Sequence, residues 1–116
     1  DLVRSRGLGD VYKRQELEQA DQVDFYNGLE VYYSVLGHNK KQEAIAVLIE
    51  KNDHKIYVYQ LDKGISQDKA ATISREKGAS DIDKITFGRY QDKPIWEVKS
   101  GNQYYLVDFE TGAVIQ

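Results

Sequence analysis

Apolar and polar residues alternate with a period of two along much of the chain, which is typical of strands that bury one face. The alternating segments are rich in Val, Ile and Tyr, and short polar segments separate them. The third segment is apolar enough to lie at the centre of a sheet. The first half of the chain therefore predicts a four-stranded antiparallel meander over residues 23–26, 29–36, 43–49 and 55–61.

The start of this predicted sheet carries two further signals. Asn27-Gly28 between the first two strands is a strong hairpin signal. Residues 16–22 favour a helix, and we interpret them as the end of a helix that begins upstream. The period of two also places four apolar side chains of the second strand on one face, namely Leu29, Val31, Tyr33 and Val35.

The second half of the chain predicts a helix followed by strands. Ser66 is a good N-cap, helix-favouring residues follow at 67–77, and Gly78 is a natural helix stop. Trp96 is expected to pack in the core beneath this helix. The strands are expected at residues 83–90, 95–99, 103–108 and 113–115, which gives an α+β fold with a boundary between units 16–61 and 62–116.

The first fifteen residues differ from the rest, because four basic residues and two Gly occur there without an apolar period. Residues 5–15 correspond to the in-frame translation of a common transposase-based sequencing adapter, and residues 10–15 to the transposon end. We therefore interpret residues 1–15 as an adapter-derived artefact without a fold, and we expect the gene to be truncated upstream. Resequencing the locus with a different library chemistry tests this interpretation.

Removing this segment changes the charge of the chain. The whole chain has a formal charge of −3, the first fifteen residues contribute +2, and residues 16–116 therefore carry −5. An acidic body argues against a nucleic-acid-binding surface. The chain has no Cys, so a thiol nucleophile, a thiolate ligand and a disulfide are all excluded. No run of about 18 apolar residues is present that could span a membrane.

The second half resembles the PepSY domain. The resemblance is carried by residues 64–70 at the helix start, by residues 88–98, and by residues 104–115. In the last segment Gly112 can supply the positive φ of a tight turn, while Asp108 and Thr111 can bond the backbone of that turn.

Residues 16–116, taken in order, resemble the TseB-like (YpmB) cell-wall elongation regulators of Firmicutes. Residues 25–28 and 93–98 are the most informative segments, and their order and spacing support the resemblance. In that family a short cytoplasmic tail and one transmembrane helix precede two cystatin/PepSY-like domains. The resemblance implies two such units here, each a helix packed on an antiparallel sheet, with the first helix truncated.

The resemblance also implies a function. It implies an extracytoplasmic, membrane-anchored protein without catalysis or cofactor, linked to the control of a class A or B penicillin-binding protein during sidewall elongation. The single-pass N-terminal anchor would be missing from this chain. The alternative is a protease-inhibitor or propeptide-like module, since PepSY and cystatin-like folds also serve in that way. No segment of the sequence is typical of an inhibitor loop that enters a catalytic cleft.

The chemically reactive residues predict neither a catalytic site nor a metal site. A zinc site needs three or four suitably placed ligands, and the only two histidines lie in polar segments. The serines lack a nucleophile-elbow motif. The carboxylates of the second half lie in predicted turns and on a strand face, which indicates a role in solubility rather than in acid–base catalysis. The residues with side chains capable of such chemistry are His38, His54, Ser34, Ser66, Ser74, Asp81, Asp83, Asp92 and Glu97.

The tyrosines leave two interpretations open. One Tyr of each neighbouring pair can pack in the core while the other covers the outer face of a sheet. Alternatively, the tyrosines form an exposed patch that binds a partner protein, since Tyr is favoured at interfaces. The candidate partner-binding residues are Tyr32, Tyr57, Tyr59 and Tyr104.

Overall fold

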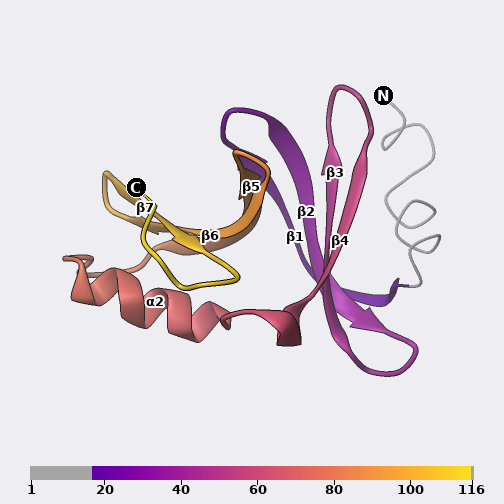
Figure 1. The fold of residues 1–116 in the computed structure, drawn as a ribbon, viewed down its shortest axis with the longest axis horizontal. Helices are drawn as coiled ribbons and strands as arrows, with labels where there is room; N and C mark the ends of the chain where they lie inside the picture. The colour runs from indigo at the N-terminus through magenta and orange to yellow at the C-terminus, as the bar shows by residue number, and fades with distance from the viewer. Residues whose placement is uncertain (1–16, 116) are drawn as a thin grey trace.

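The computed structural model describes residues 17–115, which form two antiparallel sheets and one α-helix (Figure 1). The interpretation of residues 1–15 as an artefact lies outside the described residues. No helix within residues 17–115 is long and apolar enough to cross a membrane. The elements are β1 (Leu17–Asn27), β2 (Val31–Asn39), β3 (Ala44–Glu50), β4 (Ile56–Gln60), the 3₁₀ helix η1 (Leu61–Lys63), α2 (Gln67–Glu76), β5 (Lys84–Tyr90), β6 (Lys93–Ser100) and β7 (Gln103–Asp108).

The first sheet has the strand order β1-β2-β3-β4, which confirms the predicted meander. Strand β3 is central and almost entirely buried, as its continuous apolar run predicts. One cross-strand row consists of a valine from each strand, so register and hydrophobic pattern agree across the whole sheet. That row is Val23, Val35, Val47 and Val58.

The interpretation of residues 16–22 as the end of a helix is wrong where the structure describes them. Residues 17–22 belong to β1, and Leu17 pairs with Asn39 of β2. Leu17 is buried in an apolar cluster with Val35 and Ile45. Long-range pairing with β2 therefore overrides a local helix preference that is worth only tenths of a kcal/mol per residue.

The first hairpin also differs from its prediction. Asn27 pairs with Val31, so three residues rather than two connect the strands. Leu29 lies in this connection with a relative exposure of 72%. The prediction that Leu29 shares a face with Tyr33 and Val35 is therefore wrong, because the longer loop removes it from the ladder.

The second sheet has the order β5-β6-β7, and α2 packs against β6 and β7. The predicted ends of the helix are confirmed: the Ser66 Oγ accepts a hydrogen bond from the Lys69 N–H at 3.0 Å, and Gly78 follows the helix with φ of 115°. Trp96 is 2% exposed, and its Nε1–H donates to the Ile65 carbonyl at 3.0 Å. Its predicted place in the core is thus confirmed.

The predicted fourth strand of this sheet, residues 113–115, is reduced to a single bridge between Val107 and Val114. The turn before it has the predicted chemistry. The Asp108 Oδ1 accepts hydrogen bonds from the N–H groups of residues 110 and 111 at 2.8 and 3.0 Å, and Gly112 has φ of 81°. This tight turn brings the chain back beside β7 for too short a distance to form a ladder.

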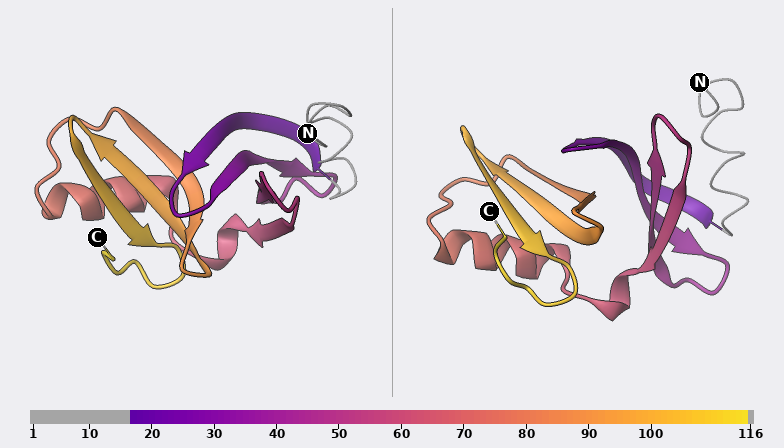
Figure 2. Two further views of the ribbon diagram at one scale, coloured as in Figure 1. Left: turned by 90° about the horizontal axis from the view of Figure 1, so that it is seen from above. Right: turned by 45° about the horizontal axis from the view of Figure 1, so that its top comes forward.

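One apolar core joins the two sheets. It contains side chains of the first sheet such as Tyr32 and Leu48 together with Phe87 and Trp96 of the second sheet. Figure 2 shows the sheets as two layers set at an angle, with α2 along one face of the second layer. The change of sheet falls between Gln60 and Gln67, and the division into units 16–61 and 62–116 stays a prediction.

Alanine substitutions at the N-cap of α2 and at a buried serine within it should change stability in opposite directions. Within residues 17–115, the Ser74 hydroxyl is the only fully buried side-chain polar atom without a hydrogen-bond partner. We expect Ser74→Ala to raise the free energy of unfolding by about 1 kcal/mol, because Ala removes the unpaired hydroxyl and favours helix. Ser66→Ala should lower it by about 1 kcal/mol through loss of the N-cap. Urea unfolding followed by circular dichroism measures both, and a shift in the same direction would contradict this account.

Candidate functional site

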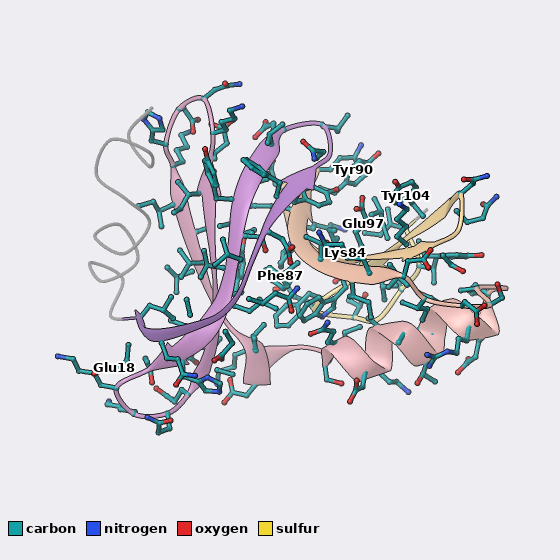
Figure 3. The ribbon with its side chains drawn as sticks, turned by 180° about the vertical axis from the view of Figure 1, so that it is seen from behind. Glu18, Lys84, Phe87, Tyr90, Glu97 and Tyr104 are labelled. Carbon is teal, nitrogen blue, oxygen red and sulfur yellow. The ribbon has the colours of Figure 1, made fainter. Side chains whose placement is uncertain are left out.

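A groove lies on the face of the second sheet opposite α2, beneath the hairpin that joins β1 and β2. Figure 3 shows Lys84, Glu97 and Tyr104 on this face and Phe87 on the side toward the helix. The groove has two parts, of about 480 and 290 Å³, and Glu97 and Tyr104 line both. The larger part is also lined by Phe25, Asn27, Lys84, Thr86 and Lys99, and the smaller part by Tyr26, Gly28, Leu29, Tyr90 and Leu106.

Strand periodicity places the floor of the groove. Alternate residues of β5, β6 and β7 face it, in two cross-strand rows. The first row is Lys84, Lys99 and Tyr104, and the second is Thr86, Glu97 and Leu106.

The wall of the groove depends on a close approach between Tyr26 and Gly88. A Cβ atom at Gly88 would overlap the ring of Tyr26, which is 1% exposed. The missing side chain of Gly88 therefore lets the end of β1 approach β5. This contact gives the groove a deep aromatic wall.

Polar contacts fix β1 to β5 at the edge of the groove. The Lys84 Nζ lies 2.9 Å from the Asp24 Oδ1, and the Gln22 Nε2 donates to the other oxygen of Asp24 at 2.6 Å. Gln22 also donates to the Ile85 carbonyl at 3.3 Å. Burial raises the pKa of Asp24, but the bonds from Gln22 and Lys84 outweigh it and hold this pKa below its ordinary value. Asp24 is thus ionised and forms an ion pair with the Lys84 ammonium.

Glu97 at the centre of the floor is half-buried. Among residues 17–115, no hydrogen bond or ion pair engages its carboxylate. Burial raises the pKa of Glu97, and the charge of Lys84 opposes the shift only in part. The groove therefore presents a partly desolvated carboxyl group that is open to a ligand.

Comparison with known proteins gives consistent matches. Residues 11–50 match the family described as "Cell wall elongation regulator TseB-like domain". The chain is 37% identical over 112 residues to "Probable cell wall elongation regulator TseB" of Bacillus subtilis (strain 168), and the alignment covers 90% of this chain and 69% of that protein. This chain belongs to the TseB-like family.

A solved structure agrees with this assignment. The YpmB protein from Bacillus subtilis matches with a TM-score of 0.80 and 32% sequence identity, over 97% of this chain and 93% of that chain. The TseB-like chain therefore shares the arrangement of both sheets with that protein, and the predicted α+β fold is confirmed.

The four tyrosines proposed as partner-binding residues occupy different environments in this TseB-like chain. Tyr32 is 2% exposed and packs in the core, while Tyr57 and Tyr59 are half-buried against it. Tyr104 is 54% exposed and lines the groove. The structure therefore does not bring the four together in one exposed patch. A partner-binding role remains a prediction, and Tyr104 is the one of the four whose exposure suits it.

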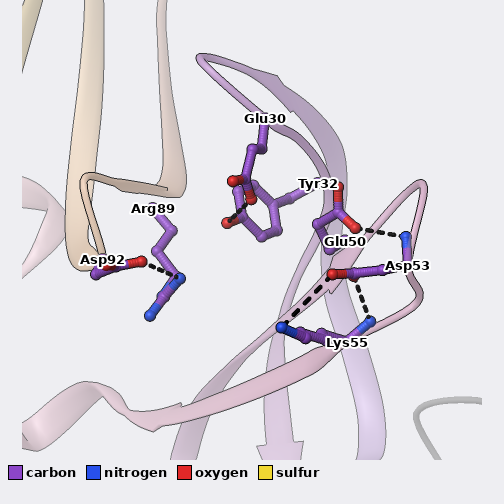
Figure 4. Close-up of polar contacts among 7 residues, drawn as sticks. All are labelled: Glu30, Tyr32, Glu50, Asp53, Lys55, Arg89 and Asp92. Carbon is purple, nitrogen blue, oxygen red and sulfur yellow. Dashed lines mark hydrogen bonds and ion pairs between the residues drawn. The ribbon is translucent and has the colours of Figure 1, made fainter.

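Arg89 explains why Tyr57 and Tyr59 are half-buried. Its guanidinium carbon lies 3.9 Å from the centre of the Tyr57 ring, and its Nε–H donates to the Tyr59 hydroxyl at 3.1 Å. A further nitrogen lies 3.3 Å from the Asp92 Oδ1, while the Tyr32 hydroxyl donates to Glu30 at 3.0 Å (Figure 4). The contacts of Arg89 with Tyr57 and Tyr59 join β5 to β4 and so connect the two sheets.

Of the four acidic residues considered for catalysis, Glu97 lines the groove, and Asp81, Asp83 and Asp92 do not. The Asp83 Oδ2 accepts from the Gly101 N–H at 2.8 Å, and Asp92 contacts Arg89. His38 pairs with Asp21 at 2.7 Å within the first sheet, where β2 extends further than predicted. The described part of the chain contains no group of three or more His, Cys, Asp or Glu residues placed to hold a metal ion.

Sequence reasoning missed most of the groove. Phe25, Leu29 and Lys84 were not candidates, and Glu97 was assigned to solubility. Alternation along the second sheet could have placed Lys84 and Glu97 on one face. The position of Phe25 and Leu29 above that face depends on contacts between elements far apart in the sequence, which no local signal reveals.

Two buried tyrosines predict a loss of stability in alkali. Burial is the main cause that raises the pKa of both Tyr26 and Tyr32 from 10.0 to about 12. Below pH 10 both hydroxyls are neutral in the folded and in the unfolded chain, and their full contribution to the free energy of unfolding is present. Between pH 10 and 12 they ionise in the unfolded chain but not in the folded one, so this contribution is lost as the pH rises. In that window each group should lower the free energy of unfolding by up to about 1.4 kcal/mol per pH unit.

The variant Tyr26→Phe tests this linkage. We expect a shallower fall of unfolding free energy between pH 10 and 12 than in the unmodified chain, measured by urea unfolding at each pH. At pH 8 the two proteins should unfold at similar urea concentrations, which serves as the control. An identical pH dependence would show that Tyr26 does not contribute to the alkaline transition.

Proposed function

We propose that this chain is a non-catalytic regulatory protein of the cell envelope that acts in cell-wall elongation by binding a penicillin-binding protein. The observation that carries the proposal is the match to the Bacillus subtilis elongation regulator over 112 residues at 37% identity. The shared two-sheet fold supports it, since the TM-score of 0.80 extends over 97% of the chain.

The groove supports binding as the mode of action. Phe25, Leu29 and Tyr104 are 44%, 72% and 54% exposed and all line it. Exposed apolar side chains gathered around a concave surface are typical of protein interaction sites. The proposal places the protein outside the cytoplasm with a single N-terminal membrane anchor, as the family resemblance implies.

Affinity purification from Bacillus subtilis envelopes tests the proposal. The chain is fused behind a membrane anchor, crosslinked in growing cells and purified, and bound proteins are labelled with a fluorescent penicillin. We expect a penicillin-binding protein to be enriched over a control in which the same anchor carries an unrelated acidic domain. Enrichment of a peptidase instead, with no labelled band, would overturn the proposal and favour the inhibitor-like alternative.

A further inference from the structure

The groove combines an apolar part with an unpaired charge. Residues 17–115 contain six large hydrophobic side chains with high exposure, and three of them line the groove. Those three are Phe25, Leu29 and Tyr104. Phe25 and Leu29 come from the β1–β2 hairpin and Tyr104 from β7, so their gathering is a property of the folded molecule rather than of a local sequence.

Glu97 lies where the two parts of the groove meet, because it lines both of them. The ammonium of Lys84, whose charge acts on Glu97, is already paired with Asp24 at 2.9 Å. A half-buried carboxylate without a partner costs free energy, and a cation supplied by a ligand would remove that cost. The site is therefore complementary to a positive group next to an apolar one.

We propose that the groove binds an extended protein segment in which a Lys or Arg side chain pairs with Glu97 and a neighbouring apolar side chain packs against Leu29 and Leu106. This inference takes from the proposed function one point, namely that the partner is a protein. It adds to that function the site of contact and the chemistry of the partner segment.

The size and lining of the groove favour a peptide. Its floor crosses three strands, which lie about 4.8 Å apart, and two such spacings equal the length of about three extended residues. The smaller part, of about 290 Å³, offers apolar surface to a side chain next to the Glu97 carboxylate. Its lining residues are Tyr26, Gly28, Leu29, Tyr90, Glu97, Tyr104 and Leu106.

A random-peptide phage library selected on the purified full chain provides the test. We expect enrichment of peptides with Lys or Arg beside a large apolar residue. A labelled peptide of the enriched sequence is then titrated by fluorescence anisotropy against the chain and its variants. Glu97→Lys should weaken binding at least about tenfold and Glu97→Gln by a smaller factor, because the first reverses the charge and the second only removes it.

The matched control is Glu76→Lys, an identical charge change at an exposed position of α2. It should leave the affinity within about twofold, since exposed charges outside a contact contribute little. Circular dichroism melting shows which variants fold, and the isosteric Glu97→Gln keeps the test valid if Glu97→Lys does not fold.

Three results would overturn the inference. The first is that the enriched peptides lack a basic residue. The second is that the unmodified chain and the folded Glu97 variants bind the peptide with equal affinity. The third is that a chitin hexasaccharide, but not the peptide, shifts the NMR signals of Tyr104 and Glu97. A penicillin-binding protein captured equally by the unmodified chain and by the Glu97 variants would refute the groove as the site while the proposed function stands. Peptide binding that depends on Glu97, without capture of such a protein, would refute the proposed function alone.

Discussion

Replacing Trp96 by Ala should lower the free energy of unfolding by about 3–5 kcal/mol. The indole is 2% exposed and makes edge contacts with Phe87 and Phe109, at ring-centre distances of 4.9 and 6.5 Å. Its Nε1–H also satisfies the Ile65 carbonyl just before α2. The substitution therefore removes packing in the shared core and leaves a polar group unpaired, two effects that add.

The variant Trp96→Phe separates these two effects. It keeps an aromatic ring in the core but cannot donate to Ile65, so we expect a smaller loss of about 1–3 kcal/mol. Urea unfolding followed by far-ultraviolet circular dichroism measures both variants without relying on indole fluorescence. A loss below about 1 kcal/mol for Trp96→Ala would show that the core does not depend on this side chain.

Replacing Gly88 by Val should lower the free energy of unfolding by about 3 kcal/mol or more, because overpacking forces neighbours out of place. The first carbon added at Gly88 would overlap the ring of Tyr26, which is itself enclosed by the core. The end of β1 would have to move away from β5. We therefore also expect the groove to widen and its aromatic wall to loosen.

A double-mutant cycle assigns this effect to one contact. In a Tyr26→Leu background, Gly88→Val should cost at least about 1 kcal/mol less than in the unmodified chain, because the overlapping ring is absent. Equal costs in the two backgrounds would mean that strain in β5 itself, rather than Tyr26, accounts for the loss.

Local signals in the sequence predicted the second half of the fold well. Ser66 and Gly78 mark the ends of α2, and Asp108 and Gly112 form the turn after β7 as expected. Each of these features depends on hydrogen bonds or dihedral angles within a few residues, so the nearby residue types are sufficient to indicate them.

Features that depend on distant contacts were predicted poorly. The strand at residues 17–22 forms because β2 offers a ladder and an apolar face, which a helix preference cannot reveal. The groove depends on Phe25 and Leu29 approaching a sheet whose residues lie more than fifty positions further along the chain. Alternation predicts which face a residue occupies, but not which other element lies opposite that face.

The contact between Arg89 and the two tyrosines of β4 has a consequence for the kinetics of recognition. It holds one side of the junction between the sheets, while the pair of Lys84 and Asp24 holds the other. Because interactions on both sides fix the shape of the groove before a ligand arrives, binding costs little free energy for rearranging the protein. Ligands of different affinity should then associate at similar rates and differ mainly in how long they stay bound.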